Sequence, residues 1–186
     1  MGLLSKIFGF KQRDNERGNT STANYPEEYQ QIIKFNCILS SLLKEDRFIA
    51  RSEYKQLVDE YASLPTFIET LKRSGMLKTY VETNNLDVIT IHRFVDTYKQ
   101  LADIATIPEI IKQHNDHFIH KHIKDEKKYL DNILKECDPN ILLDDEQREV
   151  VLSNEDYTLV IAGAGAGKTT TVAAKVRYLV EKQGVN

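Results

Sequence analysis

A run of alternating alanine and glycine leads into a lysine and three threonines near the end of the 186-residue chain. It reads AGAGAGKTT from Ala162 to Thr170. Small residues allow a tight turn whose backbone N–H groups point inward, and a helix N-terminus behind such a turn favours an anion. A lysine and a hydroxyl at the end of the turn suit phosphate oxygens and a bridging Mg²⁺. The run therefore predicts a phosphate-binding loop.

The spacing assigns a role to each position of this loop. Lys168 is expected to reach the β- and γ-phosphates, and the Thr169 hydroxyl is expected to ligate Mg²⁺, so these are the candidate catalytic residues and Thr169 is the candidate metal ligand. The run departs from GxxxxGK[ST] in its first position, which is alanine. The rest of the candidate nucleotide site is Ala162, Gly163, Ala164, Gly165, Ala166, Gly167 and Thr170.

Two elements must position the loop. Thr158–Ile161 is a short, β-branched, apolar run that predicts a strand buried on both faces. After Gly167 the apolar residues follow a helical period, and Gly184 predicts the end of that helix. These apolar residues are Val172, Val176, Leu179 and Val180. The fold class expected here is the start of a P-loop α/β domain, incomplete because one strand needs neighbours on either side.

Gln147 lies in the sequence LLDDEQREVV, shortly before the predicted strand. An amide side chain can both donate to and accept from the edge of an adenine. The alternative is an ordinary helix start, with Asp144 or Asp145 as the N-cap. The residue types alone leave both interpretations open.

Taken together, LDDEQREVV, LVIAGAGAGKTTT and KVRYLVEK resemble the start of the motor domain of superfamily 1 DNA helicases of the UvrD/Rep type. In that family the loop commonly begins with alanine. The resemblance implies that Gln147 recognises the adenine of ATP and that Lys168 and Thr169 bind its phosphates and Mg²⁺. Many relatives carry an arginine after GKT, near the base. This chain has Thr170 in that position, so the arginine's contact does not carry over to it.

A second resemblance lies upstream. His114-Asn115 with Phe118, followed by Tyr129-Leu130-Asp131, is similar to the helicase IV branch of the same family. The two resemblances together cover about residues 114–183.

The remainder of the chain predicts helices. Residues 1–24 hold a short apolar start and a polar linker, residues 25–137 are expected to form a helical accessory region, and residues 141–186 to begin the ATP-binding domain. Within the accessory region we expect helices over residues 26–45, from Ser52 to Leu64, from Pro65 to about Leu77, over a stretch that holds Ile91 to Ile104, and over residues 109–136. Such a set of amphipathic helices can close a core of its own.

Composition limits the possible partners. The net charge of −3 gives no overall attraction for nucleic acid, so DNA contacts must come from a local patch or from other parts of the motor. The apolar start over residues 1–10 is too short to cross a membrane. Two distant cysteines, Cys37 and Cys137, are typical of a reduced, cytoplasmic protein.

Residues 114–128 contain two clusters that could do chemistry. The histidines could bind zinc and the lysines could follow a nucleic-acid backbone, but no cysteine or carboxylate completes a zinc set, and nearby acids dilute the basic stripe. A solvated helix face is the favoured interpretation of both. The clusters are His114, His117, His120 and His122, and Lys121, Lys124, Lys127 and Lys128.

The leading functional hypothesis is the ATP-binding N-terminal part of a DNA helicase that uses ATP and Mg²⁺ to move along single-stranded DNA. The catalytic acids of such a motor should follow the loop, so we expect little or no hydrolysis by these 186 residues. One alternative is a helical protein-interaction module with a nucleotide-sensing or vestigial P-loop, which would bind a protein partner through residues 25–137. Another is an unrelated P-loop ATPase.

Overall fold

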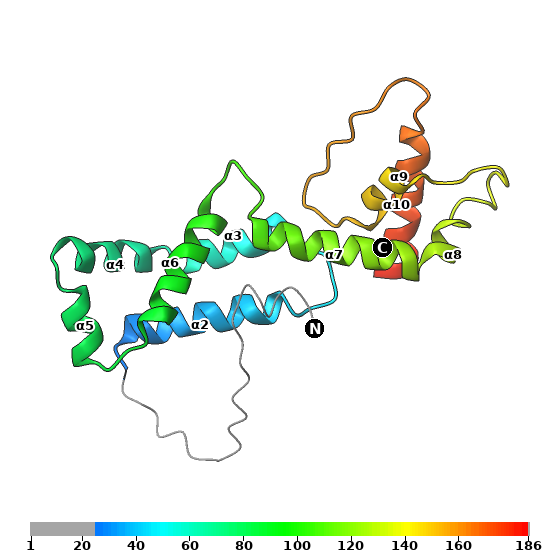
Figure 1. The fold of residues 1–186 in the computed structure, drawn as a ribbon. Coiled ribbons are helices and arrows are strands. Elements are labelled where there is room, and N and C mark those ends of the chain that lie inside the picture. Colours follow the sequence, from blue (N-terminus) through cyan, green and yellow to red (C-terminus); the bar gives the residue numbers. More distant parts are fainter. Residues whose placement is uncertain (1–24, 186) are drawn as a thin grey trace, which may run out of the picture.

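The computed structural model describes residues 25–185, and this part of the chain consists of helices and connecting loops (Figure 1). The segment and linker expected over residues 1–24 lie outside it. The helices, in chain order, are α2 (Glu27–Leu42), α3 (Arg51–Glu60), α4 (Ser63–Arg73), α5 (Leu77–Thr83), α6 (Val88–Ala102), α7 (Glu109–Asp125), α8 (Lys127–Leu130), α9 (Asp145–Leu152) and α10 (Lys168–Gln183).

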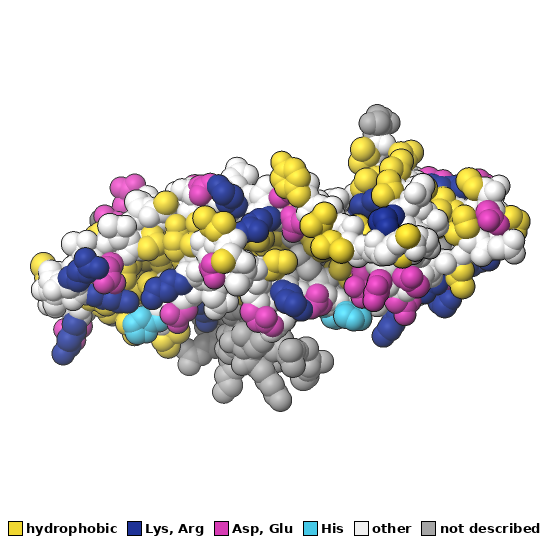
Figure 2. Space-filling model, turned by 90° about the horizontal axis from the view of Figure 1, so that it is seen from above, with side chains coloured by type: hydrophobic (Ala, Val, Ile, Leu, Met, Phe, Trp, Pro, Cys, Tyr) yellow, Lys and Arg dark blue, Asp and Glu magenta, His cyan; other side chains and the backbone are white. Residues whose placement is uncertain are grey.

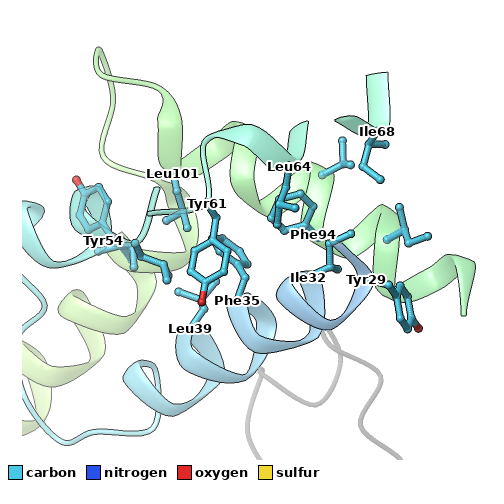
Figure 3. Close-up of a cluster of buried hydrophobic side chains, with 14 of the residues drawn as sticks. Tyr29, Ile32, Phe35, Leu39, Tyr54, Tyr61, Leu64, Ile68, Phe94 and Leu101 are labelled. Atoms are coloured by element: carbon cyan, nitrogen blue, oxygen red, sulfur yellow. The ribbon is translucent and has the colours of Figure 1, made fainter. Parts of the chain in front are cut away.

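A first hydrophobic core lies among α2, α3, α4 and α6 (Figure 3). Its centre is Phe35, which is fully buried and meets Phe94 and Tyr61 edge to face, with ring centroids 5.0 and 5.6 Å apart. Edge-to-face pairs add to the stabilisation from burial of the ring area. The apolar faces expected from the helical period thus cover one another in this region.

A second core joins α8 and the turns after it to α9 and α10. Leu130 and Leu134 pack there with Val151 and Ala174, so residues from both sides of the 137/141 boundary share it. Helix α7 connects the two cores: Ile111 near its start belongs to the first, and Ile119 and Ile123 near its end pack against the second. Figure 1 shows α7 running between the two groups of helices.

A largely buried arginine, Arg148, forms two ion pairs beside this second core. The Arg148 guanidinium of α9 donates to Asp131 at 2.7 Å and to Asp145 at 2.8 Å, and its side chain is only 10% exposed. A buried arginine needs such partners because an unpaired charge is costly away from water. Lys127, and then Arg148, lower the pKa of the Asp131 carboxyl below its usual value, which keeps it ionised.

The observed helices differ from the predicted ones at several boundaries, including Pro65 and the end of α7. Helix α4 begins at Ser63 and includes Pro65, which was expected to separate two helices. Proline is tolerated in a first turn because its missing N–H would have no partner there. The helix expected over residues 109–136 ends at Asp125, and the short helix α8 and turns continue the apolar spacing.

The strand predicted over Thr158–Ile161 is not formed, and this part of the fold prediction is corrected. Residues 158–163 belong to no helix or sheet, and Leu159 and Ile161 are 84% and 87% exposed. A strand forms through hydrogen bonds to a neighbouring strand, and the described part of the chain contains no strand to pair with it. The described residues also include no helix that is long and apolar enough to cross a membrane.

Candidate functional site

The glycine-rich loop turns into α10 through left-handed backbone. Gly165 and Gly167 have φ of 78° and 75°, a conformation that suits glycine and strains other residues. The Thr171 hydroxyl donates to the Gly167 carbonyl at 3.0 Å, and its backbone N–H donates to the same oxygen at 2.9 Å. This buried threonine fixes the junction between the loop and the helix.

Lys168 lies over its own loop. Its ammonium donates to the carbonyls of Ala162 and Gly163 at 2.7 and 2.6 Å. These two bonds hold the ammonium close to the loop. To bind a phosphate there, the ammonium would exchange one or both carbonyls for phosphate oxygens. Thr169 follows in the first turn of α10 and is exposed to solvent, as are Ala162, Gly163, Ala164, Gly165 and Ala166, while Thr170 is half-buried.

The structure brings Gln147 to this loop. Its amide Nε2 donates to the Ala166 carbonyl at 3.4 Å, and a Cβ added to Gly167 would lie only 2.5 Å from the same nitrogen. A side chain at position 167 would therefore displace the Gln147 amide, and the φ of 75° itself favours glycine there. Gln147 is also the third residue of α9, where its Oε1 accepts from the Asp144 N–H at 3.1 Å and Asp144 caps its N–H at 2.8 Å.

The two interpretations of Gln147 are therefore compatible. A carboxamide oxygen has two lone pairs and its nitrogen has two hydrogens, so one of each stays available after the contacts with Asp144 and Ala166. The capping box fixes the side chain at the start of α9, and the loop lies beside it. Residues 19 positions apart in sequence thus form one site.

Lys175, which the sequence did not single out, lies on α10 behind this site. Its ammonium donates to the Val151 carbonyl at 2.9 Å and to the Ser153 carbonyl, at the C-terminal end of α9. Burial lowers the pKa of Lys175 to about 8. Lys175 lies on the side of α10 that carries the buried Thr171 and Tyr178, and its carbonyl partners could not be found from the sequence because they belong to the end of another helix.

A pair of acids before the loop was also missed. Glu155 accepts from the Arg51 N–H at 2.8 Å, and Asp156 accepts from the Ser52 N–H and hydroxyl at 2.7 and 2.8 Å. Both acids thus cap the N-terminus of α3, where carboxylates are stabilised by the free N–H groups and the helix dipole. The contact joins the segment that enters the loop to the helical region, across 104 residues of sequence.

The histidines of α7 have separate partners. His114 Nε2 lies 2.8 Å from the Arg47 carbonyl, His120 Nδ1 lies 2.6 Å from the Asp116 carbonyl, and His122 lies near Asp46. Among residues 25–185, no group of three or more histidine, cysteine or acidic side chains is placed to hold a metal ion. Of the basic stripe, Lys121 and Lys127 pair with Asp46 and Asp131.

Comparison with known proteins agrees with the sequence resemblance at the loop. The family described as UvrD/REP helicase N-terminal domain matches residues 143–186. A probable DNA helicase II homolog of Mycoplasma capricolum subsp. capricolum is 44% identical over 45 residues, which is 24% of this chain and 6% of that protein. The chain thus spans a small fraction of the relative's length. No solved structure matches.

The matched residues contain both Gln147 and the loop around Lys168, which the structure places side by side. The helicase IV resemblance over residues 114–131 lies outside them and stays a prediction. Over residues 143–186, the chain is thus similar to the UvrD/REP helicase N-terminal domain.

Proposed function

We propose that residues 141–186 bind ATP with Mg²⁺ as the opening part of a helicase motor that moves along single-stranded DNA in the intact protein. The observation that carries this proposal is the contact between Gln147 and the loop at Ala166 and Gly167. It joins a side chain that can recognise adenine to a backbone turn that can hold phosphates. In this proposal Lys168 binds the β- and γ-phosphates and Thr169 ligates Mg²⁺.

The exposed apolar side chains support an α/β continuation of this domain. Leu159 and Ile161 precede the loop, and Val172, Val176 and Val180 line one side of α10 at 54–58% exposure. Figure 2 shows hydrophobic side chains on the surface of the part that carries α9 and α10. We propose that further strands of the same domain cover these residues and convert residues 158–161 into a paired strand.

We also propose that these 186 residues bind ATP without hydrolysing it at an appreciable rate. Hydrolysis needs a carboxylate near Mg²⁺ and another to position water. The sole acid after Gly167 is Glu181, about 20 Å along α10 from Lys168 at 1.5 Å per residue. Its carboxylate is held by Arg177 at 2.7 Å and by the Tyr129 hydroxyl at 2.9 Å.

Nucleotide binding by the purified chain tests this proposal. Calorimetry with MgATP should give saturable binding that Lys168→Ala weakens at least tenfold, while Lys128→Ala, which removes an exposed lysine of α8, should leave it unchanged. Equal binding by the wild type and Lys168→Ala would contradict the assignment of the loop.

A second variant tests the adenine assignment. Gln147→Glu keeps an oxygen for the Asp144 N–H and removes the amide donor, so the preference for ATP over GTP should fall while α9 stays capped. If the preference is unchanged, Gln147 is only a helix cap. For turnover, phosphate release with and without single-stranded DNA should stay at background, and DNA-stimulated release would overturn that part of the proposal.

A further inference from the structure

Lys175 is a half-buried cation with an unusual set of partners. Its ammonium meets two backbone carbonyls, Val151 at 2.9 Å and Ser153, and within residues 25–185 it forms no ion pair with a carboxylate. An ammonium removed from water is costly unless its hydrogens are bound, so both carbonyls are needed to keep it there. The carbonyls gain as well, because the last turn of a helix leaves its C=O groups without partners.

These two carbonyls belong to the end of the helix that carries Gln147. Helix α9 has eight residues, so about 12 Å separates its ends. At the first end, Gln147 touches Ala166 and Gly167. At the second end, Lys175 reaches across from α10. Since the loop runs directly into α10, α9 is attached at both ends to one continuous unit, and two attachments define its orientation.

Apolar packing also joins α9 and α10 between these two attachments. The side chains that α9 and α10 contribute to the second core are Val151, Leu152, Ala174 and Tyr178. Apolar contacts are not directional and allow a short helix to tilt, whereas a hydrogen bond depends steeply on distance and angle. The polar attachments are therefore the contacts that can hold the angle of α9: Arg148 joins it to Asp131, and Lys175 joins its C-terminal end to α10.

We infer that Lys175 is a positioning residue for base recognition: by binding the C-terminal carbonyls of α9, it holds Gln147 beside the phosphate loop at the angle that adenine requires. The claim that Gln147 recognises the base rests on the proposed function. The claim that Lys175 holds Gln147 in place rests on geometry alone. The hydrogen bonds of the Lys175 ammonium go to Val151 and Ser153 and not to the glycine-rich loop. Loss of the Lys175 ammonium should therefore change the preference for ATP over GTP more than it changes the affinity for the phosphates.

Three variants separate this role from a merely structural one. Lys175→Met keeps the aliphatic stem and removes the donors, Lys175→Arg restores a cationic donor, and Lys128→Met makes the same change at an exposed lysine. Affinities for MgATP and MgGTP are measured for each. Lys175→Met should lower the ratio of ATP to GTP affinity about tenfold, the worth of one well-placed hydrogen bond. Lys175→Arg should recover most of the ratio, and Lys128→Met should match the wild type.

Equal weakening of both nucleotides by Lys175→Met, or an unchanged ratio, would overturn the inference. A second measurement needs no nucleotide: the two side-chain amide protons of Gln147 are followed by NMR. In the wild type and in Lys175→Arg, the amide proton bonded to the Ala166 carbonyl should exchange slowly with water, whereas in Lys175→Met both protons should exchange as fast as those of an exposed glutamine. Unchanged signals in Lys175→Met would also overturn the inference. If the wild type binds neither nucleotide, the proposed function fails and the amide signals still decide the role of Lys175.

If Lys175→Met does not fold, Lys175→Gln provides the same comparison. Its amide can reach one carbonyl rather than two, so the loss of base preference should be smaller and in the same direction. An unchanged base preference in a folded Lys175→Gln, with unchanged Gln147 signals, would count against the inference.

Discussion

Helices α2 and α10 are both sixteen residues long and both carry a row of apolar side chains, but they use it in opposite ways. Helix α2 buries its row, which is Tyr29, Ile32, Phe35 and Leu39. Helix α10 leaves Val172, Val176 and Val180 in solvent and buries a mixed side with Thr171, Ala174 and Tyr178. Helical spacing therefore shows that a face can be buried, and the neighbouring elements decide whether it is.

The difference has a physical cause. The helical region contains enough amphipathic helices to cover each apolar face with another. The loop segment has α9 on one side of α10 and no sheet among the described residues on the other. A helix that buries a mixed side and exposes an apolar one has two sides suited to burial, which is typical of a helix between two layers. The contrast can be tested by substitution.

The largest expected effect is at the centre of the first core. Phe35→Ala removes a fully buried ring that packs on Phe94 and Tyr61, and should lower the free energy of unfolding by about 3–5 kcal/mol. Val176→Ala, on the exposed side of α10, should change it by less than about 0.5 kcal/mol. Urea unfolding measures both. Similar losses would mean that the valine face is covered in solution.

The next effect concerns the junction of the two regions. Arg148→Met leaves Asp131 without its α9 partner and should cost about 2–3 kcal/mol. A double-mutant cycle with Asp131→Asn should give a coupling near 1 kcal/mol or more, because the arginine is buried. The same cycle at Lys55 and Asp59, an exposed pair 2.9 Å apart, should give less than about 0.5 kcal/mol. Equal couplings would place Arg148 in solvent.

A smaller effect should appear as a pH dependence. The folded chain lowers the pKa of Lys175 to about 8 from the ordinary 10.5, so between these values the unfolded chain holds a proton that the folded chain has lost. Stability from this group therefore rises as pH increases through this window, and below it the buried charge opposes folding. Urea unfolding at pH 7.5, 8.5 and 9.5 should show the rise in the wild type and not in Lys175→Met.

The titration of buried tyrosines sets the highest pH at which this unfolding experiment can be interpreted. Burial raises the pKa of Tyr178 in α10 and of Tyr129, which packs against the second core, so their contribution to stability is present at lower pH and is lost above pH 10. Measurements below pH 9.5 avoid this opposite trend. Parallel curves for the wild type and Lys175→Met would show that the amine titrates as it does in water.

The smallest effect is at the remote cap of α3. Asp156→Ala removes the acceptor of the Ser52 N–H and hydroxyl and should cost about 1 kcal/mol. Asp87→Ala is the matched control, because Asp87 caps α6 from within its own segment, through the N–H groups of Ile89 and Thr90. The two losses should be similar. No loss at Asp156 beside a normal loss at Asp87 would mean that the loop segment is detached from the helical region in solution.

The sequence predicted the features that depend on neighbours along the chain. Asp144 caps α9, and Gly184 ends α10 with φ of 66°, as expected for a left-handed residue after a helix. The helices around Phe35 and Phe94 follow the apolar period. The loop and Gln147 could be singled out because their residue types and spacing are specific, and the contact between them followed only from the fold.

What could not be predicted depends on distant parts of the chain. Lys175 reads as one more basic residue of a helix until α9 is seen to end beside it. Glu155 and Asp156 read as loop residues until α3 is placed against them. The strand predicted over residues 158–161 is not formed among the described residues, because a strand needs a partner strand and one segment alone cannot specify it.

The acids that cap α3 also bear on how much order a ligand must impose. The chain is fixed at Asp156 by Ser52 and at Gly167 by Thr171 and the nearby amide of Gln147. The exposed stretch between them is thus a closed loop rather than a free arm, and the entropy of bringing its two ends together is already lost on folding. A phosphate would have to restrict only the backbone rotations that remain, so the helical region preorganises a turn that it does not touch.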